Sequence, residues 1–196
     1  LSSSDLSSAS IQRAQLRRSW FVNANFSMAT IVDTKFTACQ MGGASLSAAV
    51  HDVSFERSVF DSRTDFTGIA LQGAIKFDDT TLKQARLGSL RVNHDRFVAI
   101  GAPPTLLRFE RANLAGASFA GASINDADFN LADAQEANFS HAQLMRASFK
   151  NTDLTRAVFH SARISGAEFI SAAIYDTHFN GVTGRSDPGT TFFRNL

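Results

Sequence analysis

Large apolar residues recur every five positions along most of the chain. The series is regular from Leu6 to Leu46 and from Phe109 to Phe179, and a small residue, most often Ala, stands two positions before nearly every large one. This period matches neither an α-helix, with 3.6 residues per turn, nor a strand, whose side chains alternate every two residues. The pattern predicts a chain that turns a corner after every fifth residue. Four such sides, each with one large and one small side chain pointing inward, make a square coil of twenty residues.

The polar position before each large residue completes a recognisable motif. Residues 112–114, 127–129, 137–139 and 152–154 each read Ala or Thr, then Asn or Asp, then Leu or Phe. With these segments the chain resembles the pentapeptide-repeat family, whose repeat is A-(D/N)-L-x-x with Leu or Phe at the centre. The resemblance covers nearly the whole chain and implies an all-β fold, a right-handed quadrilateral β-helix of about eight coils that is irregular in the middle. An Ala-rich helical bundle, the alternative, does not explain the five-residue period.

A step of twenty residues places large side chains above one another in columns along the walls of the solenoid. Neighbouring coils should lie about 4.8 Å apart, the distance between hydrogen-bonded strands, so phenylalanine rings can stack with an offset. A dry interior of this kind explains why the chain has 18 Phe but only one Tyr and one Trp. The two aromatic columns, on opposite walls, are predicted to be Phe109, Phe129, Phe149 and Phe169, and Phe119, Phe139, Phe159 and Phe179.

The regular spacing fails at places that divide the chain. Register slips between 47 and 97 predict irregular coils in an N-terminal solenoid part, residues 1–97. Residues 98–108 contain Pro103 and Pro104, which cannot donate to a ladder, so this segment is predicted to be a loop or junction before the regular part at 109–180. In the tail, 181–196, Phe192, Phe193 and Leu196 are predicted to cap the last coil or to form a dimer contact.

No group of residues in the sequence matches a catalytic, metal-binding or nucleotide-binding motif. The five His are scattered without a metal-ligand spacing, and a Gly-rich phosphate loop is absent. We therefore expect no enzymatic activity, no metal and no cofactor. The single cysteine, Cys39, excludes an intrachain disulfide and stands at a small inward position, which predicts a buried, unreactive thiol. Since no run of 18 apolar residues occurs, we expect no membrane span.

The charges are balanced and regularly spaced. A formal net charge of +1 argues against direct binding of nucleic acid. Oppositely charged residues one coil apart should form surface ion pairs, each worth less than about 1 kcal/mol. The pairs expected from this spacing are Glu136 with Arg156, Arg156 with Asp176, Asp126 with Arg146, and Arg13 with Asp33.

The resemblance also implies a class of protein partner. The best-understood members of the family bind type II topoisomerases, DNA gyrase or topoisomerase IV, by mimicking a DNA duplex, and so confer resistance to inhibitors or toxins. Such mimicry needs an acidic surface, and residues 109–180 carry a net charge of −3 whereas residues 1–108 carry +3. The sequence thus permits a modestly acidic C-terminal half. The residues predicted to contact the partner are Pro103, Pro104, Asp126, Asp128, Asp133 and Glu136.

An interaction or targeting domain of a larger protein, such as a secreted bacterial effector, is the alternative function. The first residue is Leu1 rather than Met, which favours this alternative slightly. The expected location is the cytoplasm, or a host cell if the chain is part of a delivered effector. Because the tail contains apolar residues, a homodimer through an end coil is the alternative to capping within one chain.

Overall fold

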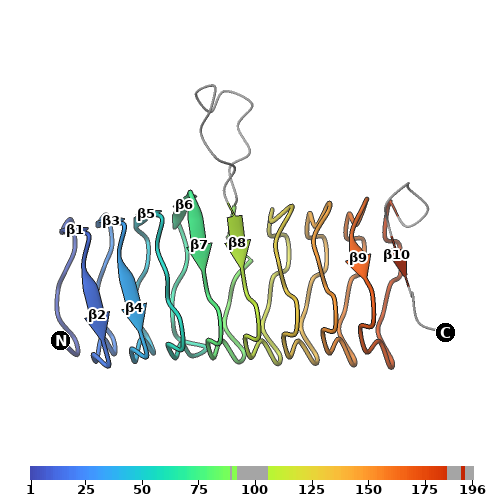
Figure 1. Ribbon diagram of the computed structural model, residues 1–196, viewed down its shortest axis with the longest axis horizontal. Helices are drawn as coiled ribbons and strands as arrows, with labels where there is room; N and C mark the ends of the chain where they lie inside the picture. Colours follow the sequence, from blue (N-terminus) through green and yellow to red (C-terminus); the bar gives the residue numbers. More distant parts are fainter. Residues whose placement is uncertain (89, 92–105, 185–190, 193–196) are drawn as a thin grey trace, which may run out of the picture.

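Stacked coils of parallel backbone form the whole of the described fold. The computed structural model describes residues 1–88, 90–91, 106–184 and 191–192. Figure 1 shows the coils stacked along one axis, with β1 near the N-terminal end and β10 near the C-terminal end. The described residues contain no helix, and their strand pairs and isolated bridges are all parallel. The predicted all-β solenoid is therefore confirmed.

The strands are short because the chain soon turns a corner. One four-stranded sheet has the order β1-β3-β5-β6, and three further sheets have two strands each. Between strands, single bridges continue the stacking from coil to coil. The strands are β1 (Ser10–Gln12), β2 (Gln15–Arg17), β3 (Thr30–Val32), β4 (Lys35–Thr37), β5 (Ala49–His51), β6 (Ala70–Gln72), β7 (Ala74–Lys76), β8 (Leu106–Arg108), β9 (Glu168–Phe169) and β10 (Thr191–Phe192).

Many corners combine a residue in the left-handed conformation with a side-chain hydrogen bond. Asn151 and Arg156, two positions after central residues, have φ of 56° and 59°. This conformation is costly for a residue other than Gly, but each backbone N–H donates to a carbonyl of the next coil, at 3.0 and 2.9 Å. The Asp153 carboxylate also accepts a hydrogen bond from the Thr155 N–H at 2.9 Å. The polar residues before the central positions thus serve corners, as their short side chains predict.

Four walls enclose a dry core, and two opposite walls are aromatic. Rings of one column stack with centroids 4.8–5.2 Å apart and interplanar angles of 16° or less. Across the core, rings of the two columns meet edge-on, as Phe119 and Phe129 do at 5.4 Å. Both predicted columns are confirmed, whereas the edge-on contacts are a finding of the structure. We number the walls by two of their central residues: face 1 (Phe129, Phe149), face 2 (Ala134, Leu154), face 3 (Phe139, Phe159) and face 4 (Ile124, Leu144).

The face 1 column extends beyond the regular half, through coils of unequal length. Phe36 stacks on Phe55 after 19 residues, Phe55 on Phe77 after 22, and Phe77 on Phe109 after 32, against 20 in the regular part. The extra residues of the longest coil include 98–105, which lie outside the described residues. Leu106–Arg108, the end of the segment predicted as a loop, form β8 in register with β7.

The two ends of the described solenoid differ. At the C-terminal end β10 pairs with β9, so the backbone at Phe192 lies in register with Phe169. Phe193 and Leu196 lie outside the described residues, and the predicted role of these three residues as cap or dimer contact stays a prediction. In the first coil, Leu6, Ile11 and Leu16 are only partly buried.

Candidate functional site

Two of the acidic residues predicted to contact a partner form ion pairs with arginines of the next coil. Asp126 accepts hydrogen bonds of 2.6 Å from the Nε and Nη2 atoms of Arg146, and these bonds raise the pKa of Arg146. Glu136 accepts a bond of 2.6 Å from Nη2 of Arg156. Two predicted surface pairs are thereby confirmed. Each removes a free negative charge from the surface that DNA mimicry would need.

The predicted acidic residues do not gather on one surface. Asp128 stands on face 1 and Asp133 on face 2, where each accepts a hydrogen bond from a backbone N–H two residues later, at 2.9 and 3.2 Å. Asp126 stands at the end of face 4 and Glu136 at the end of face 2. Pro103 and Pro104, the other predicted contact residues, lie outside the described residues. The four acids therefore serve corners and ion pairs on three different faces.

A network of charges joins the coils on either side of the long insertion. Asp78, whose side chain is only 4% exposed, accepts hydrogen bonds of 2.9 and 2.8 Å from Nε of Arg108. Arg111 donates to Asp79 through Nε at 2.7 Å and also contacts Glu110. The hydrogen bond from Arg111 lowers the pKa of Asp79, and the bond with Asp78 raises the pKa of Arg108. Both arginines therefore form ion pairs with acids of the same chain.

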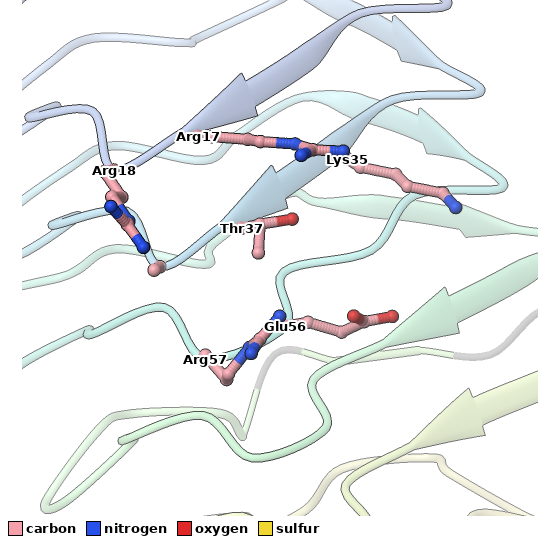
Figure 2. Close-up of a pocket in the computed structure, with 7 residues that line it drawn as sticks. Arg17, Arg18, Lys35, Thr37, Glu56 and Arg57 are labelled. Atoms are coloured by element: carbon pink, nitrogen blue, oxygen red, sulfur yellow. The ribbon is translucent and has the colours of Figure 1, made fainter.

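A groove of about 630 Å³ lies on the N-terminal part of face 1, among cationic side chains from three successive coils. Figure 2 shows these side chains, with Arg17 and Arg18 on the first coil, Lys35 and Thr37 on the second, and Glu56 and Arg57 on the third. We call this feature, lined by these six residues and Ala38, the basic groove.

The hollow of the basic groove arises from a small residue between two large ones. The Arg18 N–H donates to the Thr37 backbone carbonyl and the Ala38 N–H to the Glu56 backbone carbonyl, each at 2.9 Å. These bonds between coils place Arg18, Ala38 and Arg57 above one another in one column. All three have left-handed φ, of 49°, 55° and 54°. Since Ala38 has only a methyl group, the space between the two arginines stays open.

The cations of the basic groove have no acidic partner at ion-pair distance in the described part of the chain. Arg17 donates a hydrogen bond of 2.9 Å to Gln15, and Arg57 contributes to the low pKa of Asp79 through charge attraction without an ion pair. Among the described residues, Arg13 and Asp33 also do not form the ion pair that their spacing predicts. Sequence reasoning missed the groove, although the +3 charge of residues 1–108 was a signal for it.

The comparison with protein families agrees with the coils just described. The family profile named "Pentapeptide repeats" matches eight copies, over residues 1–37, 9–47, 112–151 and 142–181. The chain belongs to the pentapeptide-repeat family. The part of this pentapeptide-repeat protein that the profile leaves unmatched in the middle, 48–111, contains the coils of unequal length.

The comparison with solved structures finds matches at low sequence identity, among them the pentapeptide-repeat protein HetL and QnrB1. HetL, involved in heterocyst differentiation regulation in the cyanobacterium Nostoc, is 18% identical, with 91% of this chain and 86% of HetL covered and a TM-score of 0.41. A trypsin-treated QnrB1, a plasmid-mediated fluoroquinolone resistance protein, is 19% identical, with 89% and 91% covered and a TM-score of 0.44. A search of curated proteins finds no match.

The remaining polar groups of this pentapeptide-repeat protein do not assemble into a reactive centre in its described part. The rings of His141 and His160 lie 5.5 Å apart, but no third metal-ligating side chain joins them among the described residues. Cys39 is fully buried, and burial raises the pKa of its thiol. Within the described ranges, no helix has the length and apolar character needed to cross a bilayer.

Proposed function

We propose that this pentapeptide-repeat protein is a non-catalytic, protein-binding rod. The observation that carries the proposal is the regular core, in which Phe rings stack from coil to coil along most of the solenoid and left-handed corners fix the direction of the outward side chains. Repeat solenoids of this kind present long surfaces of evenly spaced side chains and bind partners along them. Preorganised side chains lose little entropy on binding, which supports a recognition role.

Type II topoisomerases, DNA gyrase or topoisomerase IV, are the first partner that we propose to test. The net charge of −3 over residues 109–180 supports a duplex-like surface there. Asp133 and Asp153 are bridge partners on neighbouring coils of face 2 and have no ion-pair partner among the described residues. The pairing of Asp126, Glu136 and other acids with basic side chains weakens this candidate relative to protein binding in general.

The test measures DNA supercoiling by purified gyrase, with and without a quinolone, as the protein is added. We expect protection from the drug, and we expect Asp133→Asn with Asp153→Asn to weaken it, because Asn keeps the corner hydrogen bond and removes the charge. The matched control is Asp65→Asn, which caps a corner on face 3 in the N-terminal half. If supercoiling and drug inhibition are both unaffected by the wild-type protein, topoisomerase binding is refuted.

An interaction or targeting domain of a larger protein is the second candidate, and the basic groove favours it. A cationic groove is opposite in charge to what a DNA mimic needs, so it supports a different partner. If the groove binds an acidic protein segment while gyrase is unaffected, this second candidate is the one that remains.

A further inference from the structure

We propose that the basic groove on face 1 binds an acidic segment of a protein partner, with a carboxylate held between Arg18 and Arg57. This inference rests on the proposed protein-binding function and adds a site and a ligand chemistry to it. Arg18 and Arg57 stand two coils apart, about 10 Å at the strand spacing, with the methyl group of Ala38 between them. Guanidinium groups reaching inward from both ends can therefore donate to one carboxylate, since arginine binds carboxylates in planar, bidentate fashion.

The donors of the groove are side chains rather than backbone groups. The N–H groups of Arg18, Ala38 and Arg57 already donate to carbonyls of the next coil at 2.9–3.0 Å. Arg17, Lys35 and the Thr37 hydroxyl supply the remaining donors around the hollow. The groove therefore offers positively charged side-chain donors, which suit an anionic group such as a carboxylate.

Several arginines elsewhere in the solenoid are neutralised by acids of the chain, whereas among the described residues the cations of the basic groove are not. Arg108, Arg111, Arg146 and Arg156 each form an ion pair with an acid within the chain. In the basic groove the lining includes four cations and a single acid, Glu56. Like charges one or two coils apart repel each other, and a bound anion relieves that repulsion.

An acidic protein segment fits the groove better than a nucleic acid does. The chain as a whole has a net charge of only +1. The cations of the basic groove lie on three coils, whereas nucleic-acid phosphates are bound by long basic stripes. Trp20 is 63% exposed and follows Arg18 by two residues, at the start of face 2 and next to the corner that carries Arg18. Tryptophan and arginine are both enriched in protein–protein interfaces.

The experiment titrates the wild-type chain into a fluorescein-labelled octaglutamate peptide and follows fluorescence anisotropy. Because Trp20 is the single Trp of the chain, its intrinsic emission with unlabelled peptide gives a second, independent reading. Three variants are compared: the double variant Arg18→Glu with Arg57→Glu, the variant Ala38→Leu, and the control Arg163→Glu, an exposed cation on face 4. Ala38→Leu keeps the charge and fills the hollow, and the backbone tolerates it because Leu131 occupies the equivalent corner with φ 62°.

We expect the double variant and Ala38→Leu each to weaken peptide binding at least about tenfold, and Arg163→Glu to change it less than about twofold. Binding should also weaken between about 0.05 M and 0.5 M salt, because exposed charges are screened. No binding by the wild-type chain, or equal binding by Ala38→Leu, overturns the proposal. Tighter binding of octathymidylate than of the peptide at the same salt overturns it in favour of nucleic acid.

Failure of the groove and failure of the proposed function give different results. If the peptide does not bind but gyrase is protected, the groove proposal alone is wrong. If the peptide binds and loses affinity in both groove variants, the groove stands whatever the outcome with gyrase. Circular dichroism of each variant confirms that lost binding is not lost folding.

Discussion

Replacing Phe139 by Ala should destabilise the solenoid strongly, because it removes one ring from the interior of an aromatic column. The ring is fully buried, stacks on Phe119 and Phe159 at 5.0 and 4.8 Å, and meets Phe129 and Phe149 edge-on at 5.5 Å. A buried Phe→Ala change costs about 3–5 kcal/mol through lost transfer energy and the cavity left behind. Four aromatic contacts, each worth about 0.5–1.5 kcal/mol beyond area burial, place the cost at the upper end, about 5 kcal/mol.

The assay is urea unfolding followed by circular dichroism, together with hydrogen exchange. Exchange is needed because stacked repeats can open in part, so a single transition need not report the whole chain. The N–H of Phe139 donates to the Val158 carbonyl at 2.7 Å, and protection should fall first at such bonds. Bonds between β1 and β3, several coils away, should keep more of their protection.

Phe139→Leu is the matched control. Leu87 occupies the same column between Phe66 and Phe119, so the column accepts Leu, and a cost of about 1 kcal/mol is expected. If Phe139→Ala unfolds at the wild-type urea concentration, stacked aromatic columns do not hold the coils together, and the account of the core is wrong.

Three further outcomes concern charged and polar groups. Asp78→Ala should cost about 2 kcal/mol in urea unfolding, because a nearly buried carboxylate bonded to Arg108 is lost; a cost near zero would contradict its bridging role. Asp79→Asn should be less stable than wild type at neutral pH. Arg111 holds the pKa of Asp79 in the folded chain below its ordinary value of 3.8, so the difference in stability should shrink below pH 3.8 and vanish once the folded carboxylate is protonated. A difference in melting temperature that does not change with pH would refute this prediction. Cys39 should react with a thiol reagent only at the rate of unfolding, and immediate labelling of the folded chain would contradict its burial.

The core of the regular half could be predicted from the five-residue pattern alone. Each repeat places its central residue inward by the same five-residue turn, so counting in twenties correctly stacks Phe109 on Phe129 and Phe119 on Phe139. Ion pairs were less predictable, because spacing brings two residues to neighbouring coils without deciding where long side chains point. Asp126 and Arg146 pair as expected, whereas Arg13 and Asp33, with the same spacing, do not.

The sequence by itself determined the coil, the dry aromatic core and the inward position of Cys39, since these depend on which residues within a repeat are large, small or polar. Only the tertiary structure decided the basic groove. In strict steps of twenty, Arg57 would stack over Thr37, but the 19-residue coil from Phe36 to Phe55 shifts it over Ala38 instead. Hydrogen bonds between coils fix that shift, and through it they place two arginines around the one small side chain that leaves space for a ligand.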